Sequence, residues 1–195
     1  NNGSSDNCSI AQVLVSVDGI NFAPAVELTC AQTGAQTLSF KVVDPSGNAD
    51  VTTTTVQVRD TTAPVAVARS ITRALDGAGA LSVSAGELDN GSSDNCAIKA
   101  LLISKDNGQS FASMVTFGCA ETGSRAVKLK VVDASNNESI ADATVTVEDT
   151  TAPVAVARSI TKVLSAETGK VTVTALELNN GSSDNCSIAQ VLVSV

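Results

Sequence analysis

The chain repeats itself, and this repetition limits its possible folds more than any other feature. Residues 1–17 and 179–195 are identical and stand 178 positions apart. A closely similar string occupies residues 89–96, and Asp60 of the linker Asp-Thr-Thr-Ala-Pro recurs as Asp149, 89 positions later. About 90 residues is a usual size for one small domain. The chain is therefore a tandem array in which two versions of one module alternate.

Cutting the array within each linker, between its Thr and Ala, divides the chain into three segments. We predict a partial repeat over residues 1–62, a complete repeat over 63–151 and a second partial repeat over 152–195. The first segment would lack the first two strands of the module. The last segment would contain those two strands, the following loop and the third strand.

The complete repeat consists of short apolar runs separated by turns. Alternating or β-branched runs predict strands at 64–71, 80–84, 97–104, 111–117, 125–132 and 140–147. A polar loop is predicted at 86–95 and a hairpin turn at 106–108. About seven short strands at this spacing predict an all-β fold, an elongated array of tandem immunoglobulin-like β-sandwich repeats of about 89 residues.

Composition restricts the partners and the core. The net charge of −8 disfavours nucleic acid and anionic membranes as partners but suits divalent cations. No apolar run approaches the roughly 18–20 residues that span a bilayer, so no membrane insertion is expected for this segment, and no signal peptide is visible. With four Phe and neither Trp nor Tyr, the core must consist of Val, Ile, Leu and Ala.

Five cysteines recur with the repeat. Their spacing favours two disulfides within single repeats, Cys8–Cys30 and Cys96–Cys119, with Cys186 left over. The alternative is that they are reduced thiols in the core. No His and no C-x-x-C spacing is present, which disfavours zinc. Disulfides would place the chain in an oxidising, extracellular compartment, where it is secreted or held at a cell surface.

Several motifs occur in a fixed order: LDNGSSDNC, a Phe, a second Cys, VKLKVVDASNN and the linker DTTAP. This combination resembles the HYR-like, immunoglobulin-type repeats that occur in tandem in very large bacterial surface and secreted adhesins. The resemblance covers the whole chain and implies an extracellular, stalk-like or filamentous adhesive role, often with calcium between repeats. One departure is that Gly47 of the first repeat is replaced by Asn136 in the second, although Asn tolerates the same left-handed turn.

Acidic residues gather in the loops that should meet at one end of the module. In an immunoglobulin-like sandwich the loop after the second strand and the loop between the last two strands return to the end where the linker enters. Clustered carboxylates repel one another unless a cation lies among them, and Ca²⁺ takes 6–8 oxygen ligands. The predicted Ca²⁺ ligands are Asp60, Glu87, Asp89, Asp94 and Asp133, then Asp149, Glu177 and Asp184 at the next linker, and Asp6 and Asp44 in the first repeat.

Hydrogen bonding alone is the competing explanation for these loops. Asp, Asn and Ser side chains bond their own backbone in tight turns, and Gly supplies positive φ. A metal role is weakest for Asp89, since the other copies have Asn1 and Asn179 there. We assign Asp18 and Asp106 to hairpin turns.

Two classes of function remain, and neither is enzymatic. There is no His, no nucleophile elbow and no P-loop, and the acidic groups recur in each repeat. The leading hypothesis is a structural spacer of an extracellular bacterial adhesin or surface filament, stiffened by Ca²⁺ and disulfides, whose partners are further copies of the same repeat. The alternative is a β-sandwich module that binds a cell-surface glycan or protein. Strand donation between chains is disfavoured because residues 1–17 and 179–195 would supply the same third strand.

Overall fold

The computed structural model describes residue 3 and residues 5–194. Contacts between them group the chain into two compact units. Unit 1 comprises residues 1–62 with the short segments 95–97 and 134–137, and unit 2 comprises 63–94, 98–133 and 138–195. Residues 152–195, predicted as a separate partial repeat, group with unit 2.

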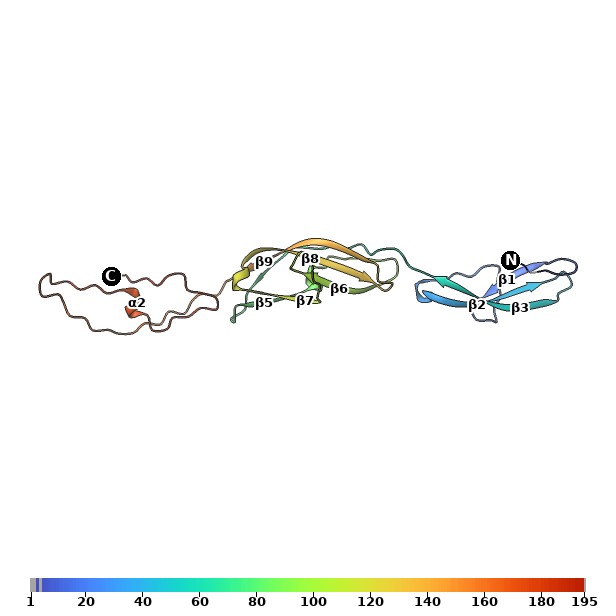
Figure 1. The fold of residues 1–195 in the computed structure, drawn as a ribbon. Helices are drawn as coiled ribbons and strands as arrows, with labels where there is room; N and C mark the ends of the chain where they lie inside the picture. Colours follow the sequence, from blue (N-terminus) through green and yellow to red (C-terminus); the bar gives the residue numbers. More distant parts are fainter. Residues whose placement is uncertain (1–2, 4, 195) are drawn as a thin grey trace. The chain divides into compact units, whose positions relative to one another are not determined.

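Unit 1 contains one antiparallel sheet in the order β1-β2-β3. Its strands are β1 (Gln12–Ser16), β2 (Gly34–Val43) and β3 (Ala49–Val58), and a 3-10 turn, η1 (Cys30–Gln32), precedes β2 (Figure 1). Strands β2 and β3 pair along their whole length, from Gly34 opposite Val58 to Val43 opposite Ala49. Strand β3 is therefore an edge of this sheet.

In unit 2 the complete repeat forms two sheets, with strand orders β4-β9-β8-β6 and β5-β7. The strands are β4 (Ile71–Ala74), β5 (Ala80–Ser84), β6 (Ile98–Ser104), β7 (Met114–Gly118), β8 (Gly123–Asp133) and β9 (Glu138–Glu148). The all-β prediction is confirmed, with six strands where about seven were expected. The predicted first strand, 64–71, is mostly irregular, and only residues 65 and 68 form isolated bridges before β4 begins.

The core lies where these two sheets face each other. Val127, Leu129 and Val131 alternate along β8 and are buried, as the sequence pattern predicts. Val83 of β5 and Phe117 of β7 belong to the same buried cluster. The core is thus almost entirely aliphatic, in agreement with the composition.

Two short helices occupy positions that the sequence analysis treated as loop or left unassigned. They are α1 (Ala85–Leu88) and α2 (Ala175–Leu178), and Leu88 at the end of α1 is fully buried. Each helix starts with a capping box, Ser84 with Glu87 and Thr174 with Glu177. Among the described residues, no helix is long and apolar enough to cross a membrane.

The turn after β8 confirms the expected equivalence of Asn and Gly. Asn136 has φ of 68° and Gly47 has φ of 89°. Both are left-handed, a conformation that Asn adopts more readily than other residues with a side chain.

Candidate functional site

The linker residue Asp60 is held by two asparagine side chains. Asn95 donates from Nδ2 to Asp60 Oδ1 at 3.3 Å, and Asn137 donates from Nδ2 to the carbonyls of Asp60 and Thr62, both at 3.2 Å. The backbone amide of Thr62 also donates to Asp60 Oδ1 at 3.0 Å. The linker therefore meets both loops that the topological argument predicted. The second oxygen, Asp60 Oδ2, is buried and has no hydrogen-bond partner among the described residues.

Three of the predicted ligands come together. Asp60, Asp94 and Asp133 each offer one carboxylate oxygen, and these oxygens all lie within 4.8 Å of one another. Asp133 is fully buried. It ends β8 opposite Ile98, the first residue of β6, so strand register determines its position. Three carboxylate oxygens at this spacing are suitable ligands for a hard divalent cation.

Glu87 and Asp89 are instead used in local structure. Glu87 Oε1 accepts from the Ser84 amide at 3.1 Å, and Oε2 pairs with Arg73 at 2.6 Å. The Ser84 bond, followed by Arg73, lowers the pKa of Glu87. Asp89 Oδ1 accepts from the Ser92 amide at 3.1 Å, and bonding to the Ser92 side chain is the main cause of its lowered pKa. Glu87 and Asp89 thus organise the helix cap and the following turn.

At the second linker the acidic residues again divide between a helix cap and the linker turn. Glu177 closes the capping box of α2 and pairs with Lys162, which is the main reason its pKa falls to about 2. Asp149 Oδ1 accepts from the Thr151 amide at 3.2 Å, as Asp60 accepts from Thr62. Glu177, like Glu87, therefore serves as the capping residue of a short helix.

Asp184, the counterpart of Asp94, shows one satisfied and one unsatisfied oxygen. Its Oδ2 accepts from the amides of Cys186 and Ser187 at 3.0 and 3.1 Å. Its Oδ1 is buried without a hydrogen-bond partner among the described residues, and so is Oδ1 of the adjacent Asn185. Two oxygen atoms at this second linker thus remain available to a cation.

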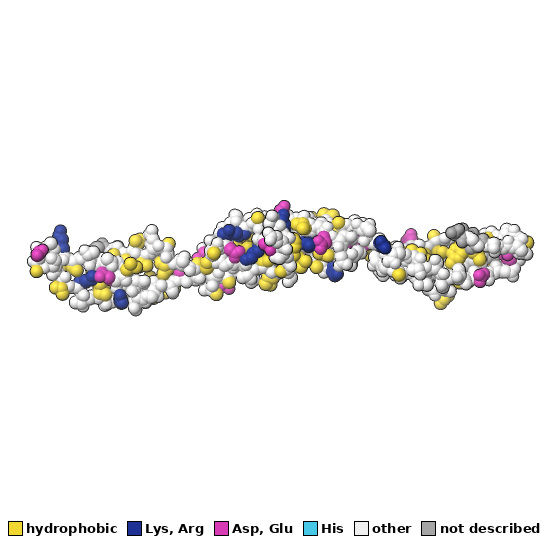
Figure 2. Space-filling model, in the orientation of Figure 1, with side chains coloured by type: hydrophobic (Ala, Val, Ile, Leu, Met, Phe, Trp, Pro, Cys, Tyr) yellow, Lys and Arg dark blue, Asp and Glu magenta, His cyan; other side chains and the backbone are white. Residues whose placement is uncertain are grey.

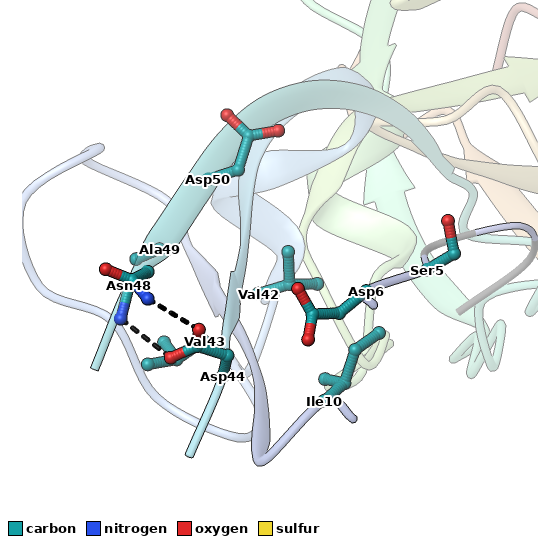
Figure 3. Close-up of a pocket in the computed structure, with 9 residues that line it drawn as sticks. All are labelled: Ser5, Asp6, Ile10, Val42, Val43, Asp44, Asn48, Ala49 and Asp50. Carbon is teal, nitrogen blue, oxygen red and sulfur yellow. Dashed lines mark hydrogen bonds between the residues drawn. The ribbon is translucent and has the colours of Figure 1, made fainter. Parts of the chain in front are cut away.

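Asp6 and Asp44 line one pocket of about 220 Å³ in unit 1 (Figure 3). Asp44 is engaged on both oxygens: Oδ1 accepts from the amides of Ser46 and Asn48, each at 2.8 Å, and Oδ2 from Asn48 Nδ2 at 2.6 Å. The Asn48 side chain is the main cause of the lowered pKa of Asp44. Asp44 is thus held ionised beside a second carboxylate.

The disulfides differ from the predicted pairing. Cys30 bonds Cys96 and Cys119 bonds Cys186, with Cα–Cα distances of 5.4 and 5.5 Å, and Cys8 is free and exposed. Each bond joins residues of two successive repeats in the sequence. The predicted bonds within one repeat, Cys8–Cys30 and Cys96–Cys119, are therefore wrong.

Strand register explains why these bonds cannot form within one repeat. Cys96 lies beside the C-terminal end of β8, because it precedes Ile98, which pairs with Asp133. Cys119 lies near the opposite end, because it follows β7 and precedes Gly123, the first residue of β8. At about 3.3 Å per residue, the length of β8 puts its two ends about 30 Å apart. A disulfide needs Cα atoms within roughly 7 Å. Spacing along the chain, about equal in both repeats, gave no sign of this separation.

Comparison with known proteins leaves the family open. No family model matches the sequence, and no curated protein matches it. The chain is all-β. Among solved structures, the fibronectin(III)-like modules of Clostridium thermocellum CbhA are 15% identical, with a TM-score of 0.34 over 75% of this chain and 82% of that chain. A TM-score this low does not establish a shared fold, so the fold assignment rests on the strands and core described above.

Asn95 and Asn137, which hold the linker, were not predicted from the sequence, and neither was the helical role of Glu87. The pattern Ser84-x-x-Glu87 is a capping-box signature, so α1 could have been predicted from it. For the two asparagines no such signal exists, because loop Asn residues are common and their partners are distant in the sequence: the Asp60 carboxylate for Asn95 and two backbone carbonyls for Asn137.

Replacing Glu87 by Ala should destabilise unit 2 by about 1 kcal/mol at pH 7, the usual effect of losing a helix cap. The folded pKa of Glu87 is below its ordinary value of 4.5, so its contribution is complete above that value and is lost as pH falls through the folded pKa. Urea denaturation of the wild type and the variant at pH 7 and pH 3 measures how the loss of stability depends on pH. The Glu87→Gln variant keeps the cap but loses the charge, so its stability at pH 7 should lie between those of the wild type and Glu87→Ala. An equal loss at both pH values would contradict the assignment.

Proposed function

We propose that the chain consists of structural spacer repeats of an extracellular adhesin or surface filament, stiffened by disulfides between successive repeats and by Ca²⁺ at the linkers. The observation that carries this proposal is the recurring disulfide pattern. In each case the cysteine that begins a 3-10 turn in one repeat, Cys30 or Cys119, bonds the loop cysteine of the following repeat, Cys96 or Cys186. Such a bond restricts bending at the linker, which is the property that a spacer needs.

Calcium is the cation that best suits the linker. Asp60, Asp94 and Asp133 supply hard oxygen ligands, and Ca²⁺ completes its shell with carbonyl oxygens, amide oxygens and water. Asp60 Oδ2 is buried without a hydrogen bond, and a bound cation would compensate its desolvation. The unsatisfied oxygens of Asp184 and Asn185 support a similar role at the next linker.

The test is a calcium titration of thermal stability. Relative to EDTA, free Ca²⁺ at about 100 times its Kd should add roughly 2.7 kcal/mol to the stability of the bound state. Asp60→Asn should reduce the rise in Tm. Asp89→Asn is the matched control, because Asn occupies the equivalent position at Asn179, and it should leave the rise intact. An unchanged Tm in EDTA and Ca²⁺ would refute the metal-linker mechanism.

An extracellular setting and a non-enzymatic role complete this proposal. Both rest on the disulfides, which persist in oxidising compartments, and on the repetition of the acidic groups in each repeat. Glycan binding receives less support, because sugar sites use aromatic rings with an open face. Here a lysine Nζ lies over three of the four Phe rings and occupies one face of each: Lys41 over Phe22 at 5.2 Å, Lys105 over Phe117 at 5.2 Å and Lys130 over Phe111 at 4.4 Å.

A further inference from the structure

The two disulfides close most of the chain between Cys30 and Cys186 into two loops. Cys30 and Cys96 are 66 positions apart, and Cys119 and Cys186 are 67 apart. The loops do not overlap, because Cys96 precedes Cys119. Tension applied outside a closed loop cannot draw the loop out, since a disulfide keeps its two ends within about 7 Å. Only residues 96–119, which we call the tether segment, lie outside both loops.

The shortest covalent path from Cys30 to Cys186 therefore runs through the tether segment. It crosses from Cys30 to Cys96, follows the backbone to Cys119 and crosses to Cys186. Fully extended, the tether segment spans about 80 Å, whereas the backbone from Cys30 to Cys186 would span about 530 Å without the disulfides. The bonds thus limit the extension of this part of the chain even when it is unfolded.

We propose that the disulfide pairing makes this chain a load-bearing tether of limited extension, in which the tether segment carries tension and the two closed loops are shielded from it. This role goes beyond the spacer proposal, which concerns bending at the linkers. It rests on the same disulfides, but it requires neither bound calcium nor an extracellular location.

The tether segment is anchored along both sheets of the complete repeat. It contains β6 and β7, whose Ile103 and Phe117 belong to the buried core. Strand β6 pairs with β8 from Ile98 to Ser104, and β7 pairs with β5 along its whole length. Both strands must leave their partners before the tether segment can lengthen. Tension is therefore resisted first by two ladders of backbone hydrogen bonds and by the core.

The turn between β6 and β7 is held closed by further contacts. Ile103 and Ala112 exchange two backbone hydrogen bonds, of 2.7 and 3.0 Å. Lys105 Nζ donates to the carbonyl of Thr116 at 2.6 Å and to Glu121 Oε1 at 2.8 Å. Figure 2 shows basic and acidic side chains next to one another on the surface of the complete repeat, in the middle of the view. The folded tether segment thus has little slack.

Both linkers lie inside closed loops. Asp60 lies between Cys30 and Cys96, and Asp149 lies between Cys119 and Cys186. A disulfide therefore carries load in parallel with each linker, so loss of the non-covalent contacts of a linker does not lengthen the chain. Because the ends of each loop stay together, less conformational entropy is lost when the loop refolds after the tension ends.

Single-molecule force spectroscopy of the full chain, held at its two termini without use of a thiol, tests the extension limit. Reductant should increase the maximum extension by about 450 Å, because it releases both closed loops. Bonds within single repeats, Cys8–Cys30 and Cys96–Cys119, would give an increase of about 150 Å. An increase near 150 Å, or none, would overturn the proposal. The maximum extension is that of the unfolded chain, so the result does not depend on whether a variant folds.

Insertions in two turns test which segment carries the load. Ten Gly and Ser residues inserted after Asn107, in the tether segment, should lengthen the oxidised chain by about 34 Å. The same insertion after Gly77, inside the first closed loop, is the matched control and should lengthen only the reduced chain. Both residues are exposed turn positions, which tolerate insertions. Equal lengthening of the oxidised chain by the two insertions would contradict the assigned path of tension.

Cysteine variants and EDTA separate this inference from the calcium proposal. Replacing both Cys119 and Cys186 by Ser should reduce the gain on reduction to about 220 Å, and Cys8→Ser should leave it at about 450 Å. EDTA should change neither value, because covalent bonds set both. A melting temperature that is the same in EDTA and Ca²⁺ would refute the metal at the linkers but leave the extension limit intact. A missing effect of reductant would refute the limit and leave the calcium titration unaffected.

Discussion

Replacing both Cys119 and Cys186 by Ser should lower the free energy of unfolding of unit 2 by about 4 kcal/mol, the largest effect that we predict. The two residues are 67 positions apart in the sequence. In the loop-entropy description, a bond that closes a loop of this length removes about 4 kcal/mol of conformational freedom from the unfolded chain. Replacing both partners leaves neither of these two sulfur atoms to form a new bond.

Guanidinium denaturation followed by far-ultraviolet circular dichroism measures this loss, and Cys8→Ser is the control. Cys8 is exposed and unbonded, so its replacement should leave the denaturation midpoint unchanged. Peptide mapping without reductant should recover Cys30 linked to Cys96 and Cys119 linked to Cys186. Recovery of a Cys96–Cys119 peptide would contradict the structure directly.

Replacing Gly79 by Ala should destabilise unit 2 by about 3 kcal/mol. A Cβ at this position would lie 2.7 Å from both the Asn185 carbonyl oxygen and Cys119 Sγ, and the backbone has φ of +74°. A left-handed residue with a side chain costs roughly 1–2 kcal/mol, and overpacking against fixed atoms costs a further 1–3 kcal/mol. The new methyl group would force the loop of Asn185 away from the disulfide.

Gly169→Ala separates the two contributions. Gly169 occupies the equivalent turn of the next repeat with φ of +62°, but no atom lies within 4 Å of a Cβ built there. This variant should therefore lose only the backbone contribution, about 1 kcal/mol. Urea denaturation of both variants measures the difference. If Gly79→Ala and Gly169→Ala cost the same, the close approach of Asn185 to Gly79 does not contribute to stability.

Much of the fold was predictable because it depends on local sequence. The alternation of Val127, Leu129 and Val131 located β8 and its buried face, and the polar turn at Asn136 located the reversal into β9. The strand predicted at 64–71 is wrong, because its alternating pattern does not form a regular strand. The loop prediction is wrong at α1, where the capping box of Ser84 and Glu87 organises residues that composition alone marks as loop.

The candidate site was predictable in part for a different reason. Strand order and direction in a sandwich decide which loops share an end, so five carboxylates could be grouped without coordinates. Three of them, Asp60, Asp94 and Asp133, come together in the structure. Glu87 and Asp89 belong to the same loop but lie outside the group, since Ser84, Arg73 and Ser92 occupy their carboxylates. Sequence separation does not reveal which carboxylates are already satisfied by their neighbours.

The sequence by itself determined the tandem repeat, the all-β class, the aliphatic core and the acidic character of the linker loops. Each of these follows from short-range patterns or from copies of one string. Only the tertiary structure decided the disulfide pairing and the engagement of Glu87 and Asp89 by neighbouring residues. The pairing depends on distances across the sandwich, where β8 separates Cys96 from Cys119, and the engagement depends on contacts with Ser84, Arg73 and Ser92.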